Sequence, residues 1–121
     1  MARAVTDSMA FQAHDVFAVM TAQSPAPLGR LFADGGPSQN HFLMQCVADT
    51  LRHPVIQAVA PEALALGAAY LAGLTLGIWS DLAAIANLRR SGRHILPQPG
   101  DAAQRLQVWN DALARATLPT A

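Results

Sequence analysis

The residues best placed for chemistry lie in the segment Asp34–Asn40, which reads DGGPSQN. Gly35 and Gly36 follow a short apolar run, and glycines let a backbone approach a ligand where a side chain would collide. Asn40 carries an amide that both donates and accepts hydrogen bonds, which suits a nucleotide base or ribose. A helix beginning here would add free backbone N–H groups that favour an electron-rich partner. The same spacing also fits a tight strand-to-helix turn with no ligand, so both interpretations stay open.

The other reactive residue types define no site by their spacing. Cys46 is the single cysteine, which excludes an internal disulfide, and its place on an apolar helical stripe predicts a packed thiol. All eight basic residues are arginines, so a phosphate-binding lysine and a Schiff-base lysine are excluded. The basic cluster between Arg89 and His94 favours a solvated helix end over a phosphate-binding patch. The histidines lack the spacing of a helical ligand pair, and we expect no metal site from His14, His41, His53 and His94.

Local patterns predict the elements that position the Asp34–Asn40 segment. Apolar residues at three- and four-residue steps predict a helix over Arg3–Met20, and a proline-containing loop follows at Thr21–Gly29. The short apolar run Arg30–Ala33 predicts a buried strand. A helix over Ser38–Arg52, with Ser38 as its N-cap, comes next. Its predicted inner stripe consists of Phe42, Leu43, Cys46, Val47 and Leu51.

Turn signals and apolar runs predict the elements after this helix. They are a strand at Val55–Val59, a helix at Ala63–Gly77 opened by Pro61 and Glu62, a shorter helix capped by Ser80, an extended segment at Arg93–Leu96 and a helix with a capping box at Asp101 and Gln104. The uncharged run Ala63–Trp79 spans roughly 25 Å as a helix, whereas a membrane core is roughly 30 Å thick. We therefore expect the Ala63–Gly77 helix to be buried in a protein core.

The order of these elements predicts the fold class. Two strands joined by a crossover helix imply a parallel pair. The fold is therefore expected to be α/β, helix-rich with a short parallel strand pair. A chain of 121 residues is long enough for one domain, yet a two-stranded sheet leaves open edges and uncovered apolar faces. We interpret residues 1–121 as a single, incomplete domain.

Composition and charge exclude several classes of function. Eight basic and eight acidic residues give a formal net charge of zero, whereas nucleic-acid binding needs a basic face. Hydrophobic residues make up 52% and charged residues 13% of the chain, which excludes a disordered tail. Arg3, Asp7 and Asp15 interrupt any apolar run near the N-terminus, so we expect no signal peptide, no membrane partner and a cytoplasmic location.

Several ordered sequence blocks resemble one protein family. The run DGGPSQNHFLMQ at Asp34–Gln45 is followed by ALGAAYLAGL at Ala65–Leu74 and by GIW at Gly77–Trp79. Together with the ARA, AFQ and DV blocks within Ala2–Val16, they are similar to the C-terminal region of the FGGY carbohydrate kinases, most of all to the glycerol kinase branch. The resemblance covers roughly residues 2–116, which is nearly the whole chain.

The resemblance implies a fold, a cofactor and a set of site residues. It implies a partial ribonuclease H-like domain of the actin-type ATPases, in which ATP with Mg²⁺ binds between two domains. In such proteins a Gly-Gly-x-Ser turn contacts the adenosine. By position, Gly36 and Asn40 fall on nucleotide-binding residues, and Gly35 shapes the turn between them. Asp34 matches the family's acid before the glycines, which implies a role in holding the loop.

Other matched positions carry structural expectations or depart from the family pattern. Glu62 and the block Ala65–Ala69 match the start of the next core helix, in which Gly67 would allow close helix packing. Gln39 stands where a small residue or lysine is usual, and His41 stands where a second asparagine is common. These changes bear on nucleotide affinity.

The resemblance also implies a function for the segment. It would be the adenosine-binding, C-terminal part of a kinase that transfers the ATP γ-phosphate to a glycerol or sugar hydroxyl. The phosphate-binding turn, the sugar pocket and the base aspartate belong to the family's N-terminal domain, and Met1 falls inside a family signature segment. We therefore expect a truncated chain with no catalytic residue, inactive alone, that meets glycerol or sugar only through the absent domain. The alternative is a non-catalytic helical module that associates with itself or a partner, and a homo-oligomer is expected.

Overall fold

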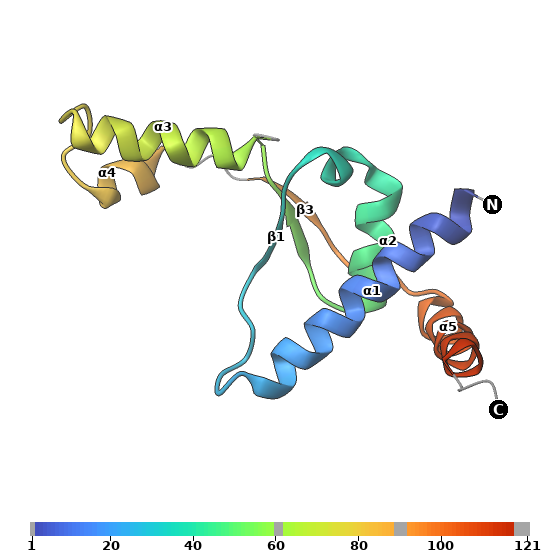
Figure 1. Cartoon of the computed structure of the whole chain (residues 1–121). Helices are drawn as coiled ribbons and strands as arrows, with labels where there is room; N and C mark the ends of the chain where they lie inside the picture. The colour runs from blue at the N-terminus through green and yellow to red at the C-terminus, as the bar shows by residue number, and fades with distance from the viewer. Residues whose placement is uncertain (1, 60–61, 89–91, 118–121) are drawn as a thin grey trace.

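The computed structural model describes residues 2–59, 62–88 and 92–117, and Figure 1 shows how their elements are arranged. The predicted helix opener Pro61 and the basic pair Arg89–Arg90 lie outside these residues. The predicted order of helices and strands is confirmed, with the first helix continuing past Met20. The elements are α1 (Ala2–Gln23), β1 (Leu31–Ala33), the 3₁₀ helix η1 (Gly36–Gln39), α2 (His41–Leu51), β2 (Val55–Gln57), α3 (Ala63–Thr75), α4 (Leu82–Asn87), β3 (Arg93–Ile95) and α5 (Ala102–Ala116).

The sheet consists of three short strands in the order β1-β2-β3. β1 and β2 run parallel, with Leu31 opposite Val55 and Ala33 opposite Gln57, which confirms the predicted parallel pair. β3 is antiparallel to β2, with Ile95 opposite Val55, so the predicted extended segment is a third strand and the sheet is mixed. The connection from β1 to β2 runs through η1 and α2, because parallel strands cannot be joined by a tight turn.

The hydrophobic core lies between the α1–α2 pair and the sheet (Figure 1). Val55 of β2 and Ala10 of α1 are fully buried there. Phe42 does not belong to the predicted inner stripe: it is 48% exposed, because it precedes the buried Leu43 and points about 100° away around the helix. The buried residues of α2 in this core are Leu43, Met44, Cys46, Val47 and Ala48.

β1 is less buried than its apolar sequence predicts. Leu31 and Ala33 pack partly against the core. Phe32 lies between them and is 42% exposed, because successive side chains of a strand point to opposite faces of the sheet. The prediction of a buried strand is therefore wrong for the face that carries Phe32.

Two helix starts differ from the sequence prediction. α4 is capped by Asp81 rather than Ser80, and the Asp81 Oδ1 accepts a hydrogen bond from the Ala84 N–H at 2.8 Å. This bond holds the pKa of the Asp81 carboxyl below its ordinary value, and a carboxylate suits the positive end of a helix better than a hydroxyl. Asp101 precedes α5, but its carboxylate accepts from Arg105 Nε at 3.0 Å and makes no capping bond.

α3 and α4 form an arm, residues 63–87, that extends away from the core (Figure 1). The prediction of a core helix is wrong here: Gly73 is the one buried residue of α3, and Leu64 is 91% exposed. The ring of Trp79 packs on Gly73 and meets Tyr70 edge-on, with 5.3 Å between ring centroids. In the described parts of the chain, no helix is long and apolar enough to cross a membrane.

Candidate functional site

The Asp34–Asn40 segment forms one ordered turn between β1 and α2. Gly35 has φ +87° and ψ 175°, a backbone conformation that is essentially restricted to glycine. It turns the chain out of the extended β1 strand and into η1, where Pro37 stands in the first turn. A proline at a helix start loses no hydrogen bond, because the first N–H groups of a helix have no partner within it.

Hydrogen bonds within the segment hold the turn closed. The buried Ser38 donates to the Gly35 carbonyl from its Oγ at 2.7 Å and from its backbone N–H at 3.1 Å. Asn40 caps α2, because its Oδ1 accepts from the Leu43 N–H at 3.2 Å. The prediction of Ser38 as the cap is wrong, since its hydroxyl is used inside the 3₁₀ turn and α2 begins only at His41.

Two features of the turn are accessible to a ligand: the backbone of Gly36 and the side-chain amide of Asn40. A Cβ built on Gly36 would meet no atom within 4 Å, so the space beside its backbone is empty. Asn40 is exposed, and its Nδ2 has no acceptor among the described residues. Gly35, Gly36 and Asn40 thus lie together at the carboxyl end of β1, the edge at which open α/β sheets bind ligands.

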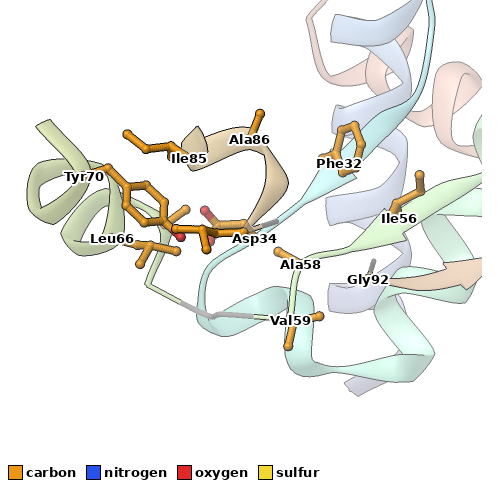
Figure 2. Close-up of a pocket in the computed structure, with 13 residues that line it drawn as sticks. Phe32, Asp34, Ile56, Ala58, Val59, Leu66, Tyr70, Ile85, Ala86 and Gly92 are labelled. Carbon is orange, nitrogen blue, oxygen red and sulfur yellow. The ribbon is translucent and has the colours of Figure 1, made fainter. Parts of the chain in front are cut away.

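An apolar pocket of about 640 Å³ lies between the sheet and the α3–α4 arm (Figure 2). Phe32 and Ile56 line it from the strands, and Leu66 and Tyr70 line it from α3. Asp34 is the one charged residue of this described lining. The carboxylate makes no hydrogen bond or ion pair with the described residues, so the expected role in holding the loop is not seen there.

Sequence reasoning missed this pocket, although a signal was present. Ala63, Leu66 and Tyr70 recur at three- and four-residue steps and so share one helical face. Gly67 also lines the pocket, and a Cβ there would meet no atom within 4 Å, so the expected close helix packing at Gly67 is wrong. Glu62 stands at the N-cap of α3 without making a capping hydrogen bond.

Two of the histidines, His41 and His53, make contacts that join separate parts of the fold. Near the turn, His41 Nε2 lies 2.8 Å from Arg93 Nη1, which joins the start of α2 to β3. His53 Nε2 lies 2.8 Å from the Gly29 carbonyl oxygen. Within residues 2–59, 62–88 and 92–117, no three His, Cys, Asp or Glu side chains are grouped so as to hold a metal ion.

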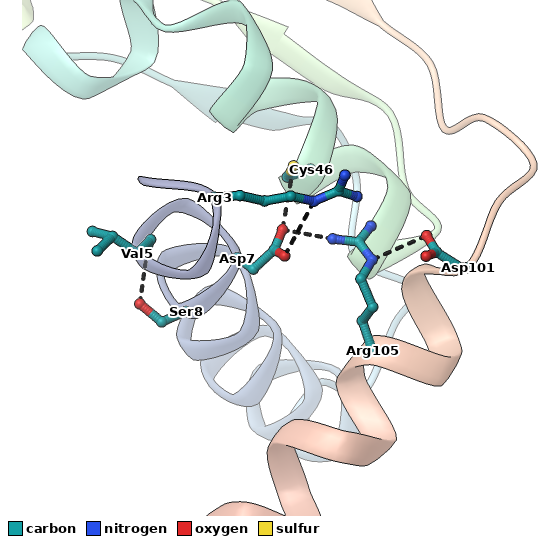
Figure 3. Close-up of polar contacts among 7 residues, drawn as sticks. All are labelled: Arg3, Val5, Asp7, Ser8, Cys46, Asp101 and Arg105. Carbon is teal, nitrogen blue, oxygen red and sulfur yellow. Dashed lines mark hydrogen bonds and ion pairs between the residues drawn. The ribbon is translucent and has the colours of Figure 1, made fainter. Parts of the chain in front are cut away.

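A polar network joins α1, α2 and α5 (Figure 3). Asp7 of α1 accepts a hydrogen bond from Arg105 Nη1 of α5 at 2.6 Å, and Cys46 Sγ of α2 lies 3.7 Å from the same carboxylate. Burial raises the pKa of the Cys46 thiol, and the Asp7 charge raises it further. The predicted buried thiol is confirmed. The ion pair was missed because its partners are 98 residues apart, beyond any spacing rule.

Comparison with known proteins establishes the family. Residues 1–76 match the model of the C-terminal domain of the FGGY family of carbohydrate kinases. The chain belongs to this family. It is 39% identical over 122 residues to the glycerol kinase of Ralstonia pickettii (strain 12J), and 43% identical over 120 residues to the apulose kinase of Pectobacterium atrosepticum. These matches cover 99% and 98% of the chain but only 24% of each relative.

The fold also matches a solved FGGY kinase. The crystal structure of Plasmodium falciparum glycerol kinase with ADP superposes with a TM-score of 0.80 and 30% sequence identity. The match covers 98% of this chain and 24% of that chain. The predicted class, a helix-rich part of an actin-type ATPase domain, is therefore confirmed. The chain spans about a quarter of the length of the curated FGGY kinases that it matches.

Proposed function

We propose that this chain is the nucleotide-binding part of an FGGY kinase of the glycerol kinase kind, and that Gly35, Gly36 and Asn40 contact the adenosine of ATP. The observation that carries the proposal is the turn after β1, which places open space beside Gly36 next to the amide donor of Asn40. It is supported by the P. falciparum glycerol kinase, which was solved with ADP and shares the fold over 98% of this chain.

Each residue has its own part in this proposal. Gly35 adopts the backbone conformation that makes the turn, and Gly36 lets the backbone come close to the base or ribose. Asn40 donates from Nδ2 to an acceptor on the nucleotide while its Oδ1 stays bound to the Leu43 N–H. Because the cap already holds the side chain in place, little rotational freedom is lost when the nucleotide binds.

In the complete enzyme, bound ATP would transfer its γ-phosphate to a glycerol or sugar hydroxyl. Relatives at similar identity include a glycerol kinase and an apulose kinase, so we propose the acceptor only as a polyol or sugar. Phosphoryl transfer depends on positioning and on charge neutralisation at the γ-phosphate, to which Mg²⁺ contributes. No three His, Cys, Asp or Glu side chains of the described residues are grouped so as to hold a metal ion, and we assign no Mg²⁺ ligand among these residues.

We further propose that this chain alone catalyses no transfer. It spans about a quarter of its relatives, and the sugar contacts and the base would come from the remainder. A cytoplasmic location is part of the same proposal.

A titration of the isolated chain with ATP, followed by amide NMR, tests the nucleotide site. We expect saturable shifts at Gly35, Gly36 and Asn40 with a Kd of about 1 mM, because only part of the pocket is present. Asn40→Ser keeps a good N-cap while removing the amide donor, so it should weaken ATP binding without lowering stability. Adenosine should shift the same residues and inorganic phosphate should not. An absence of saturable shifts, or an unchanged Kd in Asn40→Ser, would contradict the proposal.

A second candidate function, association between copies of the chain, is favoured by one face of α1. Val5, Met9, Val16 and Met20 lie on this face and are each about half or more exposed. Sedimentation of the chain and of Val16→Glu tests it: the chain should form a homo-oligomer and the variant should be monomeric. A chain that is monomeric at high concentration would exclude this candidate.

A further inference from the structure

The contact between His41 and Arg93 joins the start of α2 to the strand β3. His41 is the first residue of α2 and directly follows Asn40, whose Oδ1 caps that helix. Arg93 is 52 residues further along the chain, and its Nη1 lies 2.8 Å from His41 Nε2 and 3.1 Å from His41 Nδ1. Arg93 stands opposite Gln57, the last residue of β2, and so at the carboxyl end of the two parallel strands. The contact therefore lies at the same end of the sheet as the turn that carries Asn40.

The chemistry of these two side chains requires the imidazole of His41 to be neutral in this contact. A guanidinium has five N–H donors and no acceptor, and it keeps its charge at any physiological pH. A ring nitrogen of His41 must therefore accept the hydrogen bond from Arg93. Only a neutral imidazole can accept, because both nitrogens of an imidazolium carry a proton. Protonation of His41 thus removes the acceptor and places two positive charges side by side.

The charged groups around the contact do not compensate a proton on His41. All eight acidic residues of the chain lie within the described residues, and none of them forms an ion pair with His41 or Arg93. η1 and β2, which pack against α2, carry no titratable side chain, and the Asp49 carboxylate of α2 accepts from the Gln98 N–H. The ion pairs of α1 and α5 are Arg3–Asp7, His14–Asp15, Asp7–Arg105 and Asp101–Arg105.

We propose that His41 and Arg93 form a positioning pair for Asn40. While His41 is neutral, the contact fixes the first turn of α2 against β3 and holds the Asn40 amide beside the open space at Gly36. When His41 gains a proton, the charge of Arg93 and the positive end of the helix both oppose the contact, and the turn is released. A histidine side chain changes its charge between about pH 5 and 8, so nucleotide binding weakens as pH falls through this range. This last step rests on the proposed function, whereas the release of the turn does not.

Amide hydrogen exchange at about pH 7.5 and about pH 5.5 tests the release of the turn. The readout is the Leu43 N–H, which is bound to Asn40 Oδ1, and its rate is divided by that of an unstructured amide at the same pH. We expect this protection to fall about threefold at the lower pH in the unmodified chain. The fall should be absent in His41→Asn, whose amide does not titrate, and smaller in Arg93→Gln, which removes the like charge. His94→Asn is the matched control: His94 follows Arg93 in β3 on the opposite face, so this variant should keep the full pH dependence.

A titration with adenosine at the same two pH values tests the consequence for nucleotide binding. Adenosine is the probe because a phosphate group itself titrates near about pH 6. Its Kd should rise about threefold at the lower pH in the unmodified chain and in His94→Asn, and it should not change in His41→Asn.

Three results would overturn the proposal. They are equal protection of Leu43 at both pH values, a loss of protection that His41→Asn shares, and saturable adenosine binding with a Kd independent of pH. Arg93→Gln keeps the comparison decisive if His41→Asn fails to fold. An absence of saturable adenosine binding at both pH values would contradict the nucleotide site alone, because the exchange of Leu43 is measured without ligand.

Discussion

The substitutions Gly35→Ala and Gly36→Ala add the same methyl group at neighbouring positions, but they should differ in their effect on the free energy of unfolding. Gly35 has φ +87° and ψ 175°, whereas Gly36 has no positive φ. A Cβ on Gly35 would meet only Pro37 Cδ, at 4.0 Å, and a Cβ on Gly36 would meet nothing. Packing therefore contributes to neither substitution, and the backbone conformation alone separates their effects on folding.

The expected changes in the free energy of unfolding follow from the two backbone conformations. Gly35→Ala forces an alanine into a region that costs about 1–3 kcal/mol, so the free energy of unfolding should fall by that amount. Gly36→Ala restricts the unfolded chain and should leave the free energy of unfolding unchanged or raise it by about 0.4–1 kcal/mol. Gly36→Ala should nevertheless weaken ATP binding, because its methyl group enters the space proposed for the adenosine.

Urea unfolding followed by far-UV circular dichroism measures the stability of both variants, and an amide NMR titration measures their ATP affinity. Equal loss of stability in the two variants would refute the reasoning, because of these two glycines only Gly35 has a positive φ. A stable Gly36→Ala that binds ATP as well as the unmodified chain would refute the adenosine contact and leave the turn as a structural feature.

Three further predictions concern other parts of the fold. Asp7→Asn should lower the free energy of unfolding by about 2 kcal/mol, a value between those of exposed and buried ion pairs. A double-mutant cycle with Arg105→Gln should show coupling between the two residues, and additive effects would contradict the predicted ion pair. Gly73→Ala should displace the Trp79 ring, at a cost of about 1–3 kcal/mol, and change tryptophan emission; unchanged emission would argue against that contact. The raised pKa of Cys46 means that the unfolded state loses its proton first as pH rises, so stability should fall above about pH 8.5. Cys46→Ala should flatten this fall, and an unchanged slope would assign it to other groups.

The features that the sequence predicted correctly depend on local spacing. The apolar stripe of α2 follows the helical period, and the parallel pairing of β1 with β2 follows from the helix between them. The helix caps were harder to predict, because several good capping residues stand close together. Ser38 and Asn40 are both favourable caps, and the choice between them depends on the Ser38 hydroxyl folding back to the Gly35 carbonyl.

The ion pair between Asp7 and Arg105 could not be predicted for a different reason. The ion pair depends on how α1 and α5 pack together, and its two residues are distant in the sequence. Because tertiary packing brings the two side chains together, only the fold could show that Asp7 of α1 contacts Arg105 of α5.

The incorrect prediction for α3 has a physical explanation that bears on the whole molecule. A helix that is apolar on most sides is typical of one that is buried. In this chain the helix is exposed, with Leu64 at 91% and Leu71 at 65%. We therefore interpret the apolar sequence of α3 as suited to contacts that this quarter of an FGGY kinase does not itself contain. The prediction was wrong because local spacing shows how apolar a helix is, but it does not show which surfaces surround that helix.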